Sequence, residues 1–209
     1  MKTLELEEQL DSFDPLERRK ALEILAEQHM AAPEREGTNI NMHFHSFFSY
    51  NSKGYSPSHI AWEAKKKGLC SAGLCDFDVL DGMDEFLNAG LLLGLRTTVN
   101  VETRAYLREY ASVDINSPGE PGVTYIMGAG FAKVFPPDSS QSRGQAGYRE
   151  RARTRNIALI NRINPRLPEI AIDYEKDVVP LTPSGKATER HIISAYINQI
   201  KSVYKHPDA

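Results

Sequence analysis

The chain has 209 residues, of which 41% are hydrophobic, and a formal net charge of −3. This length allows one large domain or two small ones, with enough apolar residues for a core that needs no disulfides. The negative net charge argues against independent nucleic-acid binding, because a basic patch supplies most of that affinity. The apolar runs are far shorter than the roughly 20 residues of a membrane span, and the polar N-terminus lacks a secretion signal, so we expect a cytoplasmic location and no membrane partner.

The first residues are predicted to form a helix. Asp14 suits an N-cap, Pro15 suits the first helical position, and Glu17 follows the cap by three residues, which is a capping-box pattern. We therefore predict an N-terminal helical extension over residues 1–36 and a main domain over residues 37–209.

The main domain opens with a repeated strand and helix pattern. Segments 38–45, 69–78 and 95–107 have the composition of strands, and segments 56–68 and 81–94 have amphipathic helical patterns. Three strands joined by helices indicate a parallel sheet of βαβ units, so the predicted fold class is α/β.

Each predicted strand ends in side chains that can bind a metal. His43 and His45 close the first, Asp76 and Asp78 the second, and Glu102 lies on the third. Parallel α/β sheets and barrels build their sites at the carboxyl ends of their strands, so these residues are expected to converge.

The residue types favour a divalent cation at this place. His43 and His45 flank one residue on an extended chain and so face the same side, where both imidazoles can reach one ion. The alternative is a pair of hydrogen-bonded or solvent-facing histidines. Asp76 and Asp78 can also be read as caps of the following helix. Glu102 on an apolar strand is harder to explain without a bound cation or partner. Histidine with carboxylate suits zinc, manganese or iron.

These segments together resemble the PHP (polymerase and histidinol phosphatase) domain family. "MHFHSFFSY", "GLCSAGLCDFDVLDGMDEF" and "LGLRTTVNVET" are similar in order, chemistry and spacing to the first three motifs of that family, over residues 38–104. The resemblance implies a distorted seven-stranded β/α barrel of the PHP type, with two or three metal ions at the carboxyl ends of its strands. Such centres usually hydrolyse phosphoesters.

The resemblance assigns metal ligands residue by residue. His43 and His45 match the paired histidines, Asp76 the first Asp of the second motif, and Glu102 the ligand that bridges two metals. Phe77 stands where the family has a metal-binding histidine, which predicts that one metal subsite is missing. Tyr50 likewise replaces an Asp of the first motif, and Tyr125 or Ile126 stands near the fourth motif's histidine.

The last third of the chain supports weaker predictions. "TERHIISAY" is similar to a late family stretch, so Arg190 and His191 are candidates for substrate contact. A helix start with a half-buried histidine explains them equally well. Four alternating arginines, at positions 149, 151, 153 and 155, point around a predicted helix and are interpreted as a solvated face instead of a phosphate or nucleic-acid surface.

The length is short for a complete barrel, which usually needs about 250 residues. We therefore expect an incomplete barrel, the N-terminal part of a longer PHP-like protein, that lacks its last strands. Only His206 and Asp208 could be a remnant of the family's late ligand pair. A missing C-terminal half or an oligomer partner would then cover exposed strand edges.

The sequence thus predicts a metal-dependent hydrolase, a phosphoesterase acting on a small phosphorylated substrate. His43, His45 and Glu102 would hold the ion, and Asp76 would complete the ligand set or accept the proton of the attacking water. The main alternative is a non-catalytic or truncated PHP-like module with a degraded metal site. A nucleic-acid-associated domain is a third option, because the family includes polymerase-attached members.

Overall fold

A computed structural model describes residues 3–29 and 37–204, so His206 and Asp208 lie outside the described residues. The contacts divide the chain into two compact units. The first consists of Met1–Ser46 and Tyr55–Val134, and the second of Phe47–Gly54 and Phe135–Ala209.

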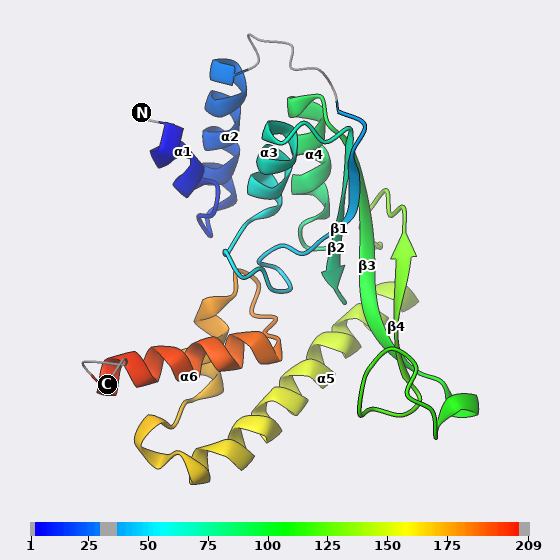
Figure 1. Cartoon of the computed structure of the whole chain (residues 1–209), viewed down its shortest axis with the longest axis vertical. Coiled ribbons are helices and arrows are strands. Elements are labelled where there is room, and N and C mark those ends of the chain that lie inside the picture. The colour runs from blue at the N-terminus through cyan, green and yellow to red at the C-terminus, as the bar shows by residue number, and fades with distance from the viewer. Residues whose placement is uncertain (1–2, 30–36, 205–209) are drawn as a thin grey trace. The chain divides into compact units, whose positions relative to one another are not determined.

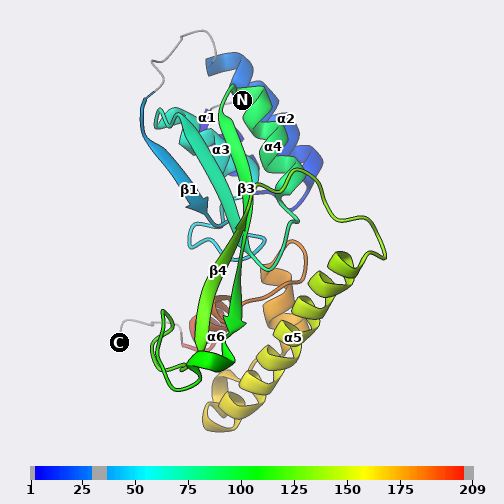
Figure 2. The same ribbon diagram turned by 90° about the vertical axis from the view of Figure 1, so that its right-hand side faces the viewer.

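The first unit is built on a curled four-stranded sheet with the strands in chain order (Figures 1 and 2). The first two pairings are parallel, as predicted from the βαβ pattern, and the last is antiparallel. The described residues contain four strands, whereas the resemblance implies seven. They are β1 (Ile40–Phe44), β2 (Ser71–Phe77), β3 (Arg96–Tyr106) and β4 (Val123–Ala129).

The two crossover helices follow the sequence pattern closely. They are α3 (Pro57–Lys66) and α4 (Met83–Leu93). The Ser56 side chain caps α3 by accepting a hydrogen bond from the His59 amide at 3.0 Å. Gly94 ends α4 in the left-handed conformation, at φ 60°, which glycine adopts without strain.

The N-terminal helices belong to the core of the first unit. They are α1 (Thr3–Gln9), which the sequence patterns did not predict, and α2 (Pro15–His29). Leu6 and Leu25 are fully buried, and buried Arg18 forms an ion pair with Glu85 of α4 at 2.5 Å. Helices α1 and α2 therefore pack within the first unit.

The predicted capping box of α2 forms only in part. The Asp14 carboxylate accepts a hydrogen bond from the Leu16 amide at 2.8 Å, as an N-cap should. Glu17 instead accepts one from the Ser12 hydroxyl at 2.6 Å. One side of the reciprocal pattern is therefore replaced by a local side-chain contact.

The second unit has its own hydrophobic core. It contains α5 (Ser140–Ile163), a π-helical turn (Tyr174–Val178) and α6 (Glu189–Val203), with Ile160, Val178 and Ile192 among the buried residues between them. Thr188 caps α6. Short 3-10 turns complete the structure, at Arg108–Tyr110 in the first unit and at Asn164–Arg166, Pro168–Ile170 and Val179–Leu181 in the second. Among the described residues, no helix combines the length and apolar character needed to cross a bilayer.

Candidate metal centre

Three of the predicted ligands meet in the first unit. Nε2 of His43 lies 3.2 Å from Nε2 of His45 and 3.1 Å from Oε2 of Glu102, and Nε2 of His45 lies 3.2 Å from the same oxygen. The three ligand atoms thus form a nearly equilateral triangle. The Glu102 side chain is 13% exposed, whereas the His43 side chain is 42% exposed, so the triangle is accessible from one side.

The spacing of this triangle fits a single divalent cation. Nitrogen and oxygen ligands that bind one ion at about 2.1 Å with tetrahedral or octahedral angles lie about 3.0 to 3.4 Å apart. Two imidazoles and a carboxylate are also a ligand set that zinc, manganese and iron accept. Without an ion, the two rings can each donate a hydrogen bond to the same Glu102 oxygen, depending on their tautomers.

A β-bulge in β1 includes His43. Asn41 pairs with Ala72 and Phe44 pairs with Leu74, so Met42 and His43 together face Gly73 alone. A Cβ atom on Gly73 would lie 2.7 Å from the Met42 backbone, which explains why glycine is needed there.

Asn100 of β3 completes the support of the bulge. Its side-chain amide donates a hydrogen bond to the Met42 carbonyl at 3.0 Å, and its oxygen accepts one from the Gly130 amide. Sequence patterns could not identify Gly73 or Asn100 as positioning residues, because their role depends on strand register.

Burial favours the neutral form of His45 at this centre, although carboxylates lie nearby. Burial lowers the pKa of His45, while the charges of Asp76 and Glu102 oppose that shift and His43 adds to it. The neutral ring is the form that binds a metal. Burial also raises the pKa of the neighbouring Cys75 thiol to about 11, with Glu102 and Asp76 adding to the shift, so this cysteine stays protonated.

Asp76 lies at the end of β2 and is 1% exposed. Its Oδ1 accepts a hydrogen bond from the Ser46 amide and its Oδ2 accepts one from the Ser46 hydroxyl, both at 2.6 Å. The carboxylate thereby fixes the chain immediately after His45. Asp76 is outside the triangle of three ligands, although its charge acts on His45.

Two neighbours of Asp76 in the second motif also have defined places. The Phe77 ring stacks on His45 with ring centroids 5.8 Å apart and packs edge-on against Tyr125. Asp78 adopts a positive φ of 57° and accepts a hydrogen bond from the Thr103 hydroxyl at 2.6 Å. Phe77 therefore restricts the ring of a ligand, and Asp78 attaches the end of β2 to β3.

The predicted substrate contacts Arg190 and His191 lie in the second unit. His191 is 5% exposed, and its Nδ1 accepts a hydrogen bond from the Thr188 amide at 3.0 Å. Tyr50 packs edge-on against its ring. His191 thus completes the capping box of α6. Arg190 is exposed.

Part of the sequence and the fold are similar to those of known proteins. No protein-family model matches the chain. Error-prone DNA polymerases of Mycobacterium bovis and Mycobacterium tuberculosis are 29% identical over 123 residues, which is 57% of this chain and 10% of theirs. The chain therefore spans about a tenth of the length of these curated relatives.

Two solved structures resemble a larger part of the chain. A protein of Bifidobacterium adolescentis assigned as a metal-dependent phosphoesterase superposes with a TM-score of 0.56 and 22% identity, over 83% of this chain and 53% of that one. An amidohydrolase of Chromobacterium violaceum, with bound sulfate and no metal, gives 0.53 and 16%, over 80% and 51%. The chain shares their mixed α/β fold. It spans about half of their lengths.

Proposed function

We propose that the chain is a metal-dependent hydrolase and that its substrate is a small phosphoester. The observation that carries the proposal is the triangle of Nε2 atoms of His43 and His45 with the Glu102 oxygen, whose sides match the ligand spacing of one divalent ion. The fold shared with a protein assigned as a metal-dependent phosphoesterase supports it. The resemblance of three motifs to the PHP family supports the phosphoester.

The chain's own residues supply the metal ligands and the groups that orient them. His43 and His45 would bind through Nε2 as neutral rings, and Glu102 would neutralise part of the cation's charge. An ion bound there supplies an acidified water and stabilises charge on the phosphoryl group. Asp76, oriented by Ser46, would accept the proton of that water or join the ligand set. Phe77, stacked on His45, would restrict the rotation of that ring.

The first test measures metal content by mass spectrometry and hydrolysis of an aryl phosphate with added manganese. We expect close to one ion per chain, and we expect H43A and E102Q each to weaken metal binding more than about 100-fold, because losing a ligand exceeds the 10- to 100-fold effect of a supporting residue. Hydrolysis should be lost in parallel.

His59→Gln is the matched control, because His59 pairs with Asp11 at 2.7 Å and does not contribute to the triangle. It should keep both metal and hydrolysis. Metal content that is the same in H43A, E102Q and the unaltered chain would show that the site assignment is wrong.

A second candidate function is a metal-binding or metal-free module without catalysis. Phe77 favours this candidate. In the PHP family, which the chain resembles, a metal-binding histidine occupies this position, whereas the Phe77 ring cannot bind a metal and packs on His45. The match to a tenth of the length of DNA polymerases also fits a domain within a larger protein. Bound metal without hydrolysis of any aryl phosphate would favour this candidate.

A further inference from the structure

One metal ion at the candidate centre would carry too little positive charge for a phosphoester. The three ligand atoms are arranged for a single ion, and the carboxylates of Glu102 and Asp76 both act on His45 with negative charge. A divalent ion would balance these two carboxylates and leave the charge of the phosphoryl group unbalanced. A basic side chain of the chain itself is therefore expected near the centre.

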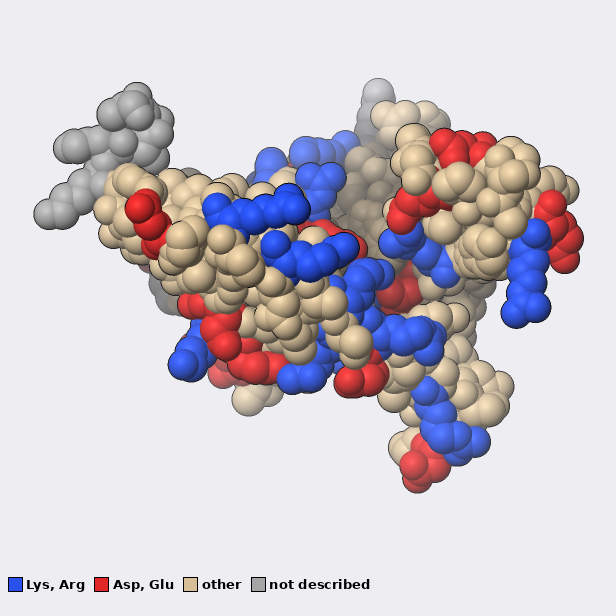
Figure 3. Space-filling model, turned by 90° about the horizontal axis from the view of Figure 1, so that it is seen from below, with Lys and Arg blue, Asp and Glu red and all other residues tan. Residues whose placement is uncertain are grey.

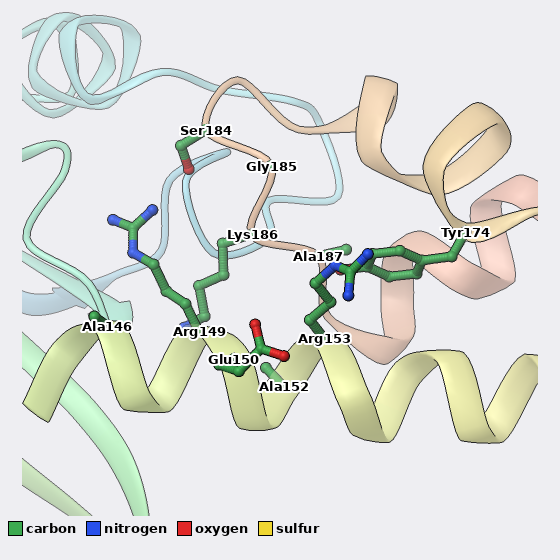
Figure 4. A pocket seen from close by; sticks show the side chains of 10 residues that line it. All are labelled: Ala146, Arg149, Glu150, Ala152, Arg153, Tyr174, Ser184, Gly185, Lys186 and Ala187. Atoms are coloured by element: carbon green, nitrogen blue, oxygen red, sulfur yellow. The ribbon is translucent and has the colours of Figure 1, made fainter.

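Several basic side chains of the second unit already pair with carboxylates. Figure 3 shows Lys and Arg side chains with carboxylates among them on the face that it presents. Arg155 pairs with Glu189 at 3.0 Å. Arg153 lines a pocket of about 190 Å³ (Figure 4) and pairs with Glu175 at 2.5 Å. Both arginines are exposed, in agreement with the predicted solvated face.

The first unit, which contains the metal centre, places Arg104 on the same face of β3 as the ligand Glu102. Side chains alternate between the faces of a strand, so these residues point to the same side, about 7 Å apart along the strand. The pairing of β2 with β3 ends at Phe77 and Glu102, so β3 carries Arg104 past the carboxyl end of β2 (Figure 1). Parallel α/β sheets bind their ligands outside this end.

A row of aromatic rings connects Arg104 to the metal ligands. Its guanidinium lies over the ring of Tyr125, 5.9 Å from the ring centroid, and Tyr125 is the residue opposite Arg104 on β4. Tyr125 packs edge-on against Phe77 with ring centroids 5.6 Å apart, and Phe77 stacks on His45. The guanidinium and the His45 ring thus lie at the two ends of one row.

The ion pair of Arg104 orients its guanidinium without using all of its donors. Glu120 accepts a hydrogen bond from Nη2, whereas Nε is buried and has no hydrogen-bond partner among the described residues. The Ser117 hydroxyl donates to Glu120 at 2.5 Å and so fixes that carboxylate. A guanidinium has five N–H groups, and the Arg104 side chain is 31% exposed, so a ligand can approach donors that Glu120 does not occupy.

We propose that Arg104 binds the phosphoryl group of the substrate at the metal centre, an inference that rests on the proposed hydrolase function. Two N–H groups of a guanidinium form a fork that matches two phosphate oxygens. With one further oxygen on the metal ion, this arrangement uses three non-bridging oxygens. A phosphomonoester has three such oxygens and a diester has two. The substrate class is therefore a phosphomonoester.

The test is calorimetric titration of the manganese-loaded full chain with phenylphosphonate, whose C–P bond resists hydrolysis. Arg104→Gln should weaken its binding by about 10- to 100-fold, because the charge-assisted fork is lost. The manganese affinity of this variant should not fall, since removing a positive charge does not disfavour a cation. Its kcat/KM should fall by a similar factor for phenyl phosphate and by less for the diester methyl phenyl phosphate.

Glu120→Gln separates ligand binding from a structural role of the ion pair. It breaks the same pair but leaves the guanidinium, so it should lose much less affinity than Arg104→Gln. Arg108→Gln removes an exposed arginine from the following 3-10 turn and should leave the affinity unchanged. Equal losses in Glu120→Gln and Arg104→Gln, or phenylphosphonate affinity in Arg104→Gln equal to that of the unaltered chain, would overturn the proposal.

Failure of the proposed function gives a different result. If the unaltered chain binds no manganese, the hydrolase and the role of Arg104 are both wrong. If it binds manganese and hydrolyses phenyl phosphate, and Arg104→Gln does so with the same kcat and KM, only the role of Arg104 is wrong. Phenylphosphonate binding that Arg104→Gln weakens, without hydrolysis by the unaltered chain, would keep the phosphate contact and reject the catalytic function.

Discussion

His191 is a neutral ring in the core of the second unit, and the hydrogen bond from the Thr188 amide needs the lone pair of its Nδ1. Burial lowers the pKa of His191 to about 4, compared with an ordinary value of 6.5. Protonation would break the cap of α6 and place a charge in an apolar environment. The residue therefore links the stability of this unit to pH.

We expect the free energy of unfolding to fall as pH decreases from about 6.5 toward 4. The unfolded chain binds the His191 proton over this range and the folded chain does not, so stability is fully present above the unfolded pKa and decreases below it. The shift corresponds to about 3 kcal/mol at most. Urea unfolding at several pH values measures it.

His191→Gln provides the comparison, because a glutamine at this capping-box position can still accept a hydrogen bond but does not titrate. This variant should lose the corresponding part of the pH dependence. Identical pH slopes for both proteins would mean that other groups cause the acid sensitivity.

At the residue scale, the ligand types could be read from the sequence because strand ends and period-2 alternation are local properties. His43, His45 and Glu102 come together as the pattern predicts. The contact of Asp76 with Ser46 could not be predicted, since it depends on the path of the chain after β1.

At the element scale, the bulge in β1 lies directly at the centre. Two residues of β1, Met42 and His43, face one residue of β2, and His43 is one of the three ligands of the triangle. Gly73 makes this possible, because its missing side chain leaves room for the Met42 backbone.

Gly73→Ala should therefore disturb both stability and metal binding. The new Cβ would lie 2.7 Å from the Met42 backbone, which is not a flexible group that can move aside. We expect a loss of about 1–3 kcal/mol in unfolding free energy, as for other overpacked sites, and metal affinity lower by about 10- to 100-fold. Denaturant unfolding and metal titration measure the two effects.

Gly144→Ala is the control for this substitution. Nothing lies within 4 Å of a Cβ atom at Gly144, which is a helical position of α5, so this change should stabilise the chain by about 0.5–1 kcal/mol. Wild-type metal affinity in Gly73→Ala would contradict the role of the bulge.

The elements differ in how well local patterns predict them. Helices α3 and α4 carry their caps in the sequence, at Ser56 and Gly94, and were placed correctly. The short helix α1 was missed, because it contributes Leu6 to a core that packing against other elements creates. The bulge was also missed, because register between distant segments is not a local property.

At the scale of the whole molecule, the described residues form two cores, and the first contains a curled four-stranded sheet where a seven-stranded barrel was expected. The first core is formed by the sheet and helices α1 to α4. The second lies among α5, α6 and the turns between them. At the sheet edge, β1 exposes Ile40 and Met42, and among the described residues no strand pairs with its outer side. A further barrel segment or an oligomer partner that covers this edge remains a proposal.

The candidate metal centre belongs to the first unit, so a bound metal should protect that unit and not the second. A ligand that binds only the folded state stabilises it by about 2.7 kcal/mol at 100 times its Kd, and hydrogen exchange reports this locally. We expect manganese to slow amide exchange in β1, β2 and β3 and to leave α5 and α6 unchanged. Equal protection of both units by manganese would show that they unfold together, because one binding event would then stabilise a single cooperative structure instead of the unit that contains its site.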